Sequence, residues 1–172
     1  MFDIGNIAHF SIGGFVMNIN FLKLSDFRSQ RTLFSRLVFE TYQLIDFIGK
    51  DYEHLCEWYW GKAVPWIFSG KMEFFLALDC EKVIGVLIAK KEEKERKICT
   101  LFIDSKYSNN GIATHLINES FEFLGTRKPI ITFSEYKLDQ FTPILQKYGW
   151  QIDEKRYKNF TKQYEFICNI KR

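Results

Sequence analysis

The segment formed by residues 101–116 combines the residue types that could hold a phosphorylated ligand. Residues 101–103 are apolar and predict the end of a strand, a polar loop follows, and Gly111 and Ala113 open an amphipathic helix. The N–H groups in the first turn of a helix have no partner within it and lie at the positive end of its dipole, so they attract anions. Small residues there let a phosphate approach the backbone closely. The segment is therefore a candidate pyrophosphate site.

The same segment also fits a plainer interpretation. Asn109 and Asn110 are typical turn formers, and a polar loop between a strand and a helix needs no ligand to explain it. A Gly-x-Ala pattern alone does not separate these two interpretations, and both stay open at this level.

The wider sequence resembles the acetyl-CoA motif of the GNAT superfamily of N-acetyltransferases, in which L-x-V and a short loop precede R/Q-x-x-G-x-G/A. Residues 101–103 match the strand part, residues 108–113 (SNNGIA) match the loop, and residues 141–150 (FTPILQKYGW) resemble the family's helix end. The resemblance covers residues 18–170 in element order and is specific across about residues 70–125. It implies that the cofactor is bound by Leu101, Phe102, Ile103, Ser108, Asn109, Asn110, Gly111, Ile112, Ala113 and Thr114.

The reaction that this resemblance implies is direct attack of an amine on the thioester of acetyl-CoA, or of another acyl-CoA, as co-substrate and without a metal. We therefore expect a CoA-dependent N-acyltransferase whose acceptor is a small-molecule or peptide amine. Two alternatives stay open. One is a degenerate member that binds CoA without turnover and serves as an interaction module. The other is a member that modifies nucleic acid, and only the mildly basic C-terminal third supports it.

Several positions depart from the family pattern. Ser108 stands where the family has Arg or Gln, which shortens or removes one pyrophosphate contact. Leu145 stands where the family has the Tyr that protonates the leaving thiolate, and Leu138 where it often has Asn. Tyr148 follows three residues after Leu145, on a different face of the helix, and we weigh core packing above catalysis for it.

Glu135 and Tyr148 are the candidate catalytic residues. Glu135 follows the strand after the cofactor helix, where the family's sheet splays open, and Glu73, at the start of an earlier strand, is a second candidate base. A solvated strand-end carboxylate is the plainer interpretation of both glutamates. His115 is interpreted as an exposed residue of the cofactor helix.

By analogy with the family, the wall of the acceptor site comes from the first two helices and their loop. That region contains three tryptophans within residues 58–68. A flat hydrophobic acceptor site and a small core beneath a long loop explain them equally well.

The hydrophobic pattern predicts one α/β domain with the order β-α-α-β-β-β-α-β-α-β-β, which by resemblance is a GNAT-like mixed, mostly antiparallel sheet flanked by helices. The predicted strands are residues 18–24, 73–78, 83–90, 97–103, 129–134, 150–157 and 163–170. The predicted helices are residues 29–48 with Ser29 as N-cap, 52–60, 112–124 and 139–148, with an irregular stretch at residues 65–70.

Length and composition limit the remaining possibilities. The 172 residues suit one domain, which we place at residues 17–172, preceded by an N-terminal extension of unclear role at residues 1–16. The extension is a poor signal peptide and is too short to span a bilayer. The net charge of +3 is too small to indicate a nucleic-acid or membrane binder. The four cysteines form no Cys-x-x-Cys pair, which favours a reducing, cytoplasmic compartment. A homodimer is compatible with the sequence.

Overall fold

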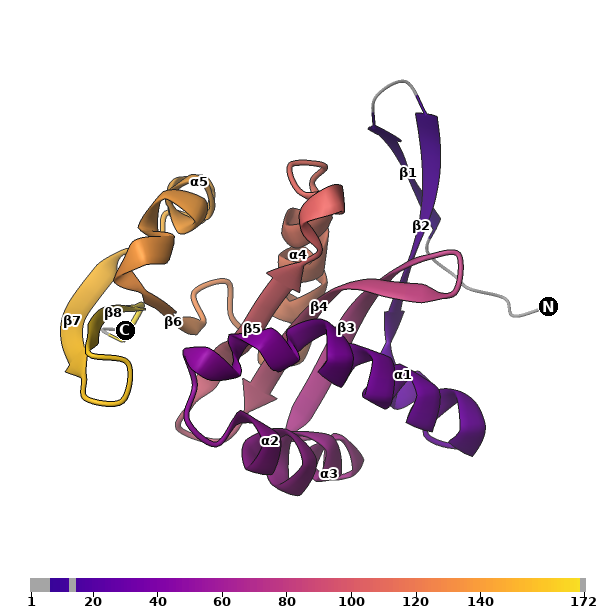
Figure 1. Ribbon diagram of the computed structural model, residues 1–172, viewed down its shortest axis with the longest axis horizontal. Helices are drawn as coiled ribbons and strands as arrows, with labels where there is room; N and C mark the ends of the chain where they lie inside the picture. The colour runs from indigo at the N-terminus through magenta and orange to yellow at the C-terminus, as the bar shows by residue number, and fades with distance from the viewer. Residues whose placement is uncertain (1–6, 13–14, 171–172) are drawn as a thin grey trace.

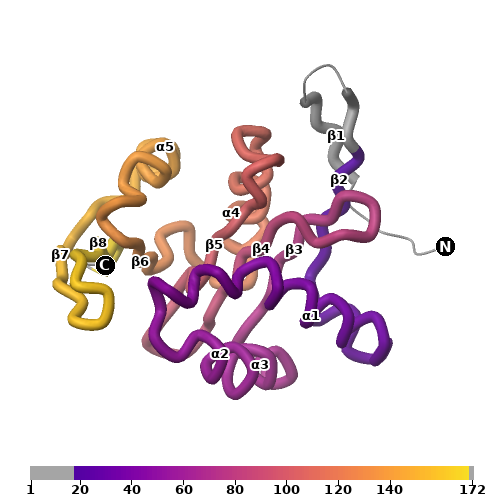
Figure 2. The backbone as a smooth tube through the Cα atoms, in the orientation of Figure 1, coloured from indigo at the N-terminus to yellow at the C-terminus, as the bar shows by residue number. Residues whose placement is uncertain are grey.

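The computed structural model describes residues 7–12 and 15–170, so residues 1–6 and 13–14 of the predicted N-terminal extension lie outside the described residues. Figure 1 shows the chain as a ribbon and Figure 2 follows the same path as a tube. The strands are β1 (Ile7–Ile12), β2 (Phe15–Lys23), β3 (Met72–Asp79), β4 (Lys82–Lys91), β5 (Arg96–Ile103), β6 (Ile130–Ser134), β7 (Ile152–Lys158) and β8 (Gln163–Cys168). The main helices are α1 (Arg31–Ile45), α2 (Leu55–Trp58), α3 (Val64–Phe68), α4 (Ile112–Leu124) and α5 (Leu138–Tyr148).

All described strands belong to one sheet in the order β1-β2-β3-β4-β5-β6-β8-β7. Every neighbouring pair is antiparallel except β5 and β6, which run parallel. The predicted mixed, mostly antiparallel sheet flanked by helices is therefore confirmed.

Two hydrophobic layers cover the two faces of the sheet. Side chains of a strand alternate between faces, so Phe74 and Leu76 of β3 pack with α1, α2 and α3, whereas Phe75 and Ala77 pack with α4. In Figure 1 the helices α1, α2 and α3 lie together on one side of the central strands, and α5 stands over β6, β7 and β8. Because both faces of β3 and β4 are covered, these strands are almost continuously buried.

The first helical region differs from the prediction at its ends. Gln30, not Ser29, precedes α1, because a 3-10 turn, η1 (Leu24–Phe27), continues into a bond from the Gln30 N–H to the Phe27 carbonyl. The helix ends at Ile45 and passes into a second 3-10 turn, η2 (Asp46–Lys50).

The stretch that was predicted as irregular at residues 65–70 is mostly helical. After α2, a π-helical turn, η3 (Tyr59–Ala63), leads directly into α3. Pro65 is one of the first residues of α3, directly after the π-helical turn, and the helical backbone continues through it although proline has no N–H to donate. The proline therefore does not interrupt the helical stretch, contrary to the irregular backbone predicted there.

Part of the predicted N-terminal extension forms an edge strand. β1 pairs antiparallel with β2, from Ile7 opposite Asn20 to Ile12 opposite Phe15, and β2 begins earlier than the predicted strand at residues 18–24. The division of the chain into an extension and a domain at residue 17 stays a prediction.

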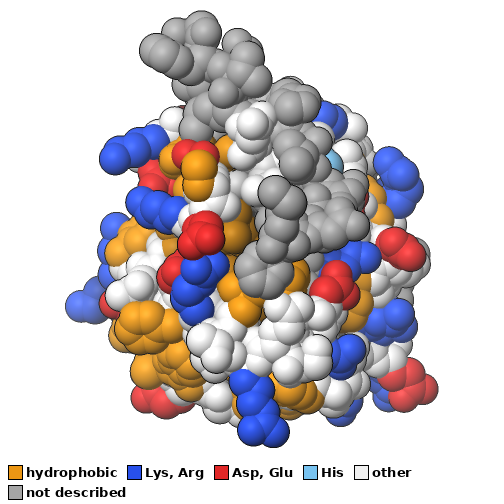
Figure 3. Space-filling view, turned by 90° about the vertical axis from the view of Figure 1, so that its right-hand side faces the viewer, with side chains coloured by type: hydrophobic (Ala, Val, Ile, Leu, Met, Phe, Trp, Pro, Cys, Tyr) orange, Lys and Arg blue, Asp and Glu red, His pale blue; other side chains and the backbone are white. Residues whose placement is uncertain are grey.

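On the face shown in Figure 3, positive and negative side chains are interspersed. Within the described part of the chain, no helix combines the length and the hydrophobicity that crossing a membrane requires. Cys56, Cys80, Cys99 and Cys168 are all free thiols.

Candidate functional site

Strand β5 separates from its parallel neighbour after only two residue pairs. Lys97 lies opposite Ile130 and Ile98 opposite Ile131, and no later residue of β5 pairs with β6. On the other side, Ala89 of β4 faces Ile98, but Ile88 faces Thr100, so the intervening Cys99 forms a bulge. Beyond this bulge the side of β5 that faces away from β4 has no strand partner among the described residues. Its backbone polar groups are therefore available to an extended ligand.

The end of β5 is held in place by a close approach of β4. Gly85 lies opposite Ile103 in the sheet. A Cβ atom on Gly85 would lie 2.8 Å from Ile103 Cδ1 and 3.5 Å from the Phe102 carbonyl oxygen. A larger residue at position 85 would require the end of the Ile103 side chain to move, so glycine allows the side chain to lie directly over β4.

The loop that follows β5 is fixed by its own polar groups. The Tyr107 hydroxyl donates to Asp79 Oδ2 at 2.7 Å, which ties the loop to the end of β3. Asn110 Nδ2 donates to the carbonyls of Tyr107, at 3.2 Å, and Ser108, at 2.8 Å. Asn109 adopts φ 63° and Gly111 φ 78°, in the left-handed region that these two residue types tolerate best.

Helix α4 begins without a side-chain cap. Gly111 is its N-cap residue and offers no side-chain acceptor to the first-turn N–H groups. These N–H groups and the positive end of the dipole of a 13-residue helix face the loop. The helix start therefore has the unsatisfied donors that an anion such as a pyrophosphate would bind.

The strand end, the loop and the helix start meet in one cleft of about 980 Å³, which we call the β5 cleft. Its opposite walls come from α1 with η2, through Gln43, Leu44 and Phe47, and from α5, through Gln140, Phe141 and Ile144. Nine of the ten predicted cofactor residues line it, namely Leu101, Phe102, Ile103, Ser108, Asn109, Gly111, Ile112, Ala113 and Thr114. The tenth, Asn110, is not part of the lining and instead holds the loop through its two side-chain bonds.

A second cavity of about 260 Å³, the inner cavity, continues from the β5 cleft between β5 and β6. The two share Phe47, Leu101, Phe102, Gln140 and Phe141 as lining residues. One part of the inner cavity is apolar, with Ile98, Ile131 and Phe133, and another is polar, with Asp51, Tyr136 and Lys137. A ligand in the β5 cleft could therefore reach a mixed apolar and polar space through the split in the sheet.

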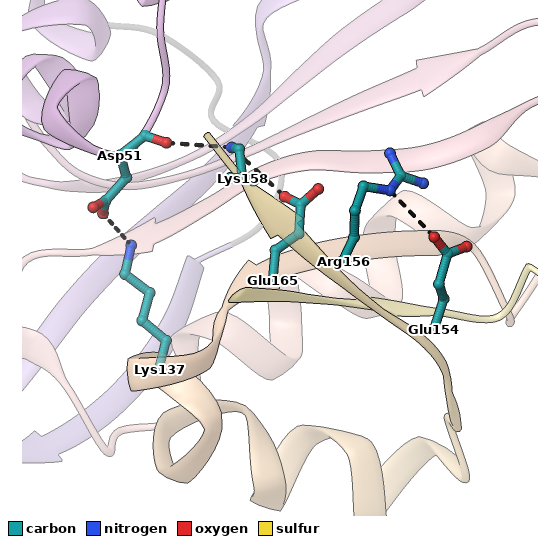
Figure 4. Close-up of polar contacts among 6 residues, drawn as sticks. All are labelled: Asp51, Lys137, Glu154, Arg156, Lys158 and Glu165. Atoms are coloured by element: carbon teal, nitrogen blue, oxygen red, sulfur yellow. Dashed lines mark hydrogen bonds and ion pairs between the residues drawn. The ribbon is translucent and has the colours of Figure 1, made fainter. Parts of the chain in front are cut away.

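The polar side of the inner cavity is a hydrogen-bonded group centred on Asp51, which is only 6% exposed. The Asp51 carboxylate accepts hydrogen bonds from the Tyr136 hydroxyl and, at 3.1 Å, from Lys137 Nζ. Lys158 of β7 donates to the Asp51 backbone carbonyl at 3.3 Å and lies 3.5 Å from Glu165 Oε2 (Figure 4). The group therefore joins the end of η2 to the segment after β6 and to β7.

The surroundings of these groups determine which of them can hold a charge. Burial acts to raise the pKa of Asp51, but the bonds from Tyr136 and Lys137 outweigh it and the net pKa is lowered. Burial raises the pKa of Tyr52 to about 12, and burial together with the Asp51 bond raises that of Tyr136. At neutral pH, Asp51 is therefore ionised and both tyrosines are neutral.

A family model described as an acetyltransferase (GNAT) domain matches residues 62–161, more than half of the chain. The chain belongs to the GNAT acetyltransferase family. The matched region includes the end of β5, its loop, α4, α5 and the separation of β5 from β6. The family predicted from the sequence is therefore confirmed.

Solved structures show the same GNAT fold. The chain is similar to a proposed streptothricin acetyltransferase from Bacillus anthracis str. Ames in complex with acetyl coenzyme A, with TM-score 0.54 and 16% identity over 62% of this chain and 67% of that one. It is also similar to a nourseothricin acetyltransferase, with TM-score 0.51 and 8% identity over 57% of this chain and 64% of that one. The chain thus spans about two thirds of the length of each. No curated protein sequence matched the chain.

Ser108, which replaces the Arg or Gln of the GNAT pattern, adds no positive charge to the β5 cleft. Among the described residues that line this cleft, none is Lys or Arg, and Asp104 contributes a carboxylate. The GNAT pattern has Arg or Gln at the position of Ser108. An anionic ligand would therefore depend on backbone N–H groups and the dipole of α4.

Tyr148 lies in the contact between α5 and α4 and is not part of the lining of the β5 cleft. Its hydroxyl bonds to Asn118 Oδ1 at 3.0 Å and to the Thr114 carbonyl at 3.3 Å, and its ring stacks on Trp150. Leu145, at the position of the usual GNAT tyrosine, is buried in the core. Its side chain offers no proton to a leaving group.

The predicted carboxylates and the histidine also lie outside the β5 cleft and the inner cavity. Glu135 is exposed and pairs with Lys155 Nζ at 2.5 Å. Glu73 is 6% exposed and accepts bonds from the Ser25 and Phe74 N–H groups, and its burial raises its pKa. His115 is half-buried, with its ring stacked 3.8 Å from that of Phe21, and its pKa is lowered by burial. Whether Glu135 or Tyr148 takes part in catalysis stays a prediction.

Sequence reasoning missed the polar residues of the inner cavity. Asp51 and Tyr136 are separated by 85 positions, and no spacing rule connects residues so far apart. A weak signal existed, because Tyr136 and Lys137 come directly after the predicted strand end at Ser134, where the GNAT sheet splays open. Glu135, the predicted base, directly precedes Tyr136 and Lys137, which do line the cavity.

Proposed function

We propose that this GNAT protein transfers an acetyl group from acetyl-CoA to the amine of an acceptor. The observation that carries the proposal is the β5 cleft, which unites the unpaired strand end, the positive-φ loop and the uncapped start of α4 in one space. These features supply backbone bonds for an extended arm and N–H donors for a pyrophosphate, which are the two chemical requirements of binding CoA.

The residues present fit the cofactor in a specific arrangement. The backbone of Leu101, Phe102 and Ile103 would hold the pantetheine arm, and the N–H groups from Asn109 to Thr114 would hold the pyrophosphate. When bound, acetyl-CoA supplies a thioester whose carbonyl carbon an amine nitrogen can attack, with the C–S bond breaking as the C–N bond forms. Phe47 and Phe141 would flank the arm where the β5 cleft opens into the inner cavity.

The residues of the inner cavity favour alignment over strong acid–base catalysis. Asp51 already accepts two bonds and has a lowered pKa, so it is a weak base. Tyr136 has a raised pKa and directs its proton to Asp51. The main contribution we expect from the protein is therefore to hold an already neutral amine in line with the carbonyl, with water accepting the proton.

A second function has an observation in its favour. The absence of Lys and Arg from the described lining of the β5 cleft, together with buried Leu145, is what a GNAT protein that binds CoA without turnover would show. Such a protein would serve as an interaction module.

One experiment tests both functions. The melting temperature is measured with and without acetyl-CoA, and release of the CoA thiol is followed against a panel of amines. A ligand-induced rise with amine-dependent thiol release supports acetyl transfer. A rise without release from any amine supports the binding module, and no rise at all contradicts both.

A further inference from the structure

A third cavity of about 280 Å³ extends the path beyond the inner cavity, and we call it the lysine cavity. It shares Ile48, Tyr52, Cys99, Thr100 and Thr132 with the inner cavity. Lys62, Lys90 and Lys97 line it, as do the rings of Tyr52 and Trp58. The β5 cleft, the inner cavity and the lysine cavity therefore follow one another along β5, from its C-terminal end to its N-terminal half.

Two of the three lysines have no carboxylate partner in the described part of the chain. Lys90 Nζ forms ion pairs with Glu92 and Glu95 of the β4–β5 turn. Among the described residues, no carboxylate lies within ion-pair distance of Lys62 or Lys97, although Lys62 Nζ lies 4.3 Å from the centroid of the Trp66 ring. Glu53 and His54 also line the cavity, but they contact each other, with 3.5 Å between Oε1 and Nε2.

Cys99, the residue of the bulge, lines the cavity together with the three lysines, and Lys90 and Lys97 lie opposite each other in the sheet beside it. Burial raises the pKa of the Cys99 thiol, the ammonium groups of Lys97, Lys90 and Lys62 act in the opposite direction, and the Glu92 carboxylate acts with burial. Lysines from η3, β4 and β5 thus all favour the charged form of the same thiol, although they are far apart in sequence. Ammonium groups that line one cavity repel one another, so an anion bound in that cavity would lower the energy of the arrangement.

We propose that the acceptor is a small amine that also carries an anionic group, a carboxylate or a phosphate, and that Lys62 and Lys97 bind this group. The inference rests on the proposed acetyl transfer and names the class of its acceptor. The amine lies in the inner cavity, facing the end of β5, and the anion lies in the lysine cavity. Tyr52 and Trp58 pack against the body of the molecule between them. A volume of about 280 Å³ suits a small molecule.

The same charges act against polycationic acceptors. A polyamine or a multiply charged aminosugar would place further ammonium groups in the cavity that Lys62 and Lys97 line, and like charges there repel. The lysines therefore favour anionic amines through attraction and disfavour polycationic amines through repulsion.

The first test compares pairs of amines that differ in the anion alone. 4-Aminobutanoate is compared with 4-aminobutanamide, O-phosphoethanolamine with ethanolamine, and spermidine represents the polycations. Values of kcat/KM are expressed per deprotonated amine, so that differences in amine pKa do not enter. We expect at least one anionic member to exceed its neutral partner by on the order of tenfold or more. The pair with the larger ratio of kcat/KM, anionic over neutral member, indicates whether the preferred anion is a carboxylate or a phosphate.

The second test assigns the preference to the lysines. Lys62→Gln and Lys97→Gln, singly and together, should reduce kcat/KM for the anionic member by on the order of tenfold per lysine and leave the neutral member and the KM for acetyl-CoA unchanged. Lys94→Gln is the matched control, because Lys94 is an exposed residue of the β4–β5 turn that does not line the cavity. Binding of each amine to the protein saturated with CoA, measured by calorimetry, gives a readout independent of turnover.

The outcomes distinguish a failure of the proposed acceptor class from a failure of the proposed acetyl transfer. If neutral amines are acetylated as fast as anionic ones, if spermidine is preferred, or if the lysine variants keep the preference, the acceptor class is wrong and acetyl transfer stands. If acetyl-CoA neither binds nor reacts with any amine, the proposed function itself fails. If turnover is absent and anionic amines also do not bind to the CoA-saturated protein, the acceptor class is overturned as well.

Discussion

The Asp51 carboxylate accepts a hydrogen bond from Lys137 Nζ at 3.1 Å, across the region where β5 and β6 separate. Asp51 follows η2 on the side of α1, whereas Lys137 and Tyr136 follow β6. With Lys158 on the Asp51 carbonyl, the contacts connect the two parts of the molecule that border the inner cavity. The position of the arm formed by β6, β7, β8 and α5 relative to η2 therefore depends on a buried carboxylate.

Replacing this carboxylate should lower stability in a pH-dependent way. Asp51→Asn removes the charge that Lys137 and Tyr136 contact, and we expect a loss of about 1–3 kcal/mol in the free energy of unfolding at neutral pH. Because the folded-state pKa of Asp51 lies below its unfolded value, the stabilisation is fully present above about pH 4–5 and is lost as pH falls through the folded pKa.

Urea unfolding at several pH values measures this difference. The gap between wild type and Asp51→Asn should be constant from pH 6 to 8 and shrink below about pH 4. Glu93→Gln, at an exposed turn residue, serves as the control and should show no gap. A gap that grows on acidification would contradict the assigned ion pair.

The start of α4 can be tested with a glycine at each end of the same helix. Gly111 is the N-cap and Gly125 the C-cap, and their φ values are 78° and 67°. Glutamate at either position suffers similar backbone strain, about 1–2 kcal/mol. Gly111→Glu also places a negative charge beside the proposed pyrophosphate site, so it should abolish the rise in Tm that acetyl-CoA causes in wild type.

Gly125→Glu should lower the Tm of the free protein at least as much, because a negative charge is unfavourable at the C-terminal end of the helix dipole, but should keep the ligand-induced rise. Thermal denaturation with and without acetyl-CoA measures both quantities. An undiminished rise in Gly111→Glu would remove this loop from the cofactor site.

Restoring the usual GNAT residue at position 108 should strengthen cofactor binding. Ser108 lines the β5 cleft, whose described lining contains no Lys or Arg. Ser108→Arg would add a guanidinium for the pyrophosphate, and we expect the Kd for CoA to fall by about 5- to 10-fold, as measured by calorimetry. The gain should decrease with added salt. Ser108→Gln, which restores the uncharged family residue, should gain less, and an unchanged Kd in both variants would place the pyrophosphate elsewhere.

Local patterns predicted most of the fold. Helix α4 occupies residues 112–124 as predicted, because its apolar period spans these residues and Gly111 precedes them, and the structure adds Gly125 as its C-cap. Helix α3 was missed because Pro65 indicates a break unless its place in the first turn is known. The contacts of Asp51 with Tyr136 and Lys137 could not be predicted, since they depend on where the sheet separates and not on any local spacing. The lysine cavity was missed for the same reason, as Lys62 and Lys97 meet only in the folded chain.

Removing residues 1–16 should leave CoA binding intact. The deletion takes away β1 and the first residues of β2, while the pairing of β2 with β3 from Ile19 to Lys23 remains. Among the residues that the structure describes, none before Gln43 lines the β5 cleft. We therefore expect the same acetyl-CoA-induced rise in Tm. Exposure of the β2 edge favours association between molecules, which size-exclusion chromatography would detect, and loss of soluble protein would show that β1 is required for folding.

Tyr148→Phe separates a packing role from a catalytic one. The hydroxyl bonds to Asn118 and to the Thr114 carbonyl, so its removal should cost about 0.5–1.5 kcal/mol in stability while the ring keeps its stacking on Trp150. If Tyr148 only packs, kcat should be almost unchanged. If it donates the proton to the leaving thiolate, kcat should fall by on the order of 10²-fold or more.

Glu135→Gln is the companion test, because it keeps the shape of the side chain and removes the candidate base. Glu135 is exposed and its carboxylate pairs with Lys155, so we expect kcat/KM to stay within about twofold of wild type. If neither variant is impaired, alignment and solvent carry the reaction, and kcat/KM of the double variant should rise with pH toward the pKa of the acceptor amine itself. A plateau near neutral pH in that double variant would contradict this view. It would indicate a base elsewhere in the inner cavity, where Asp51 and Tyr136 are the residues to replace next.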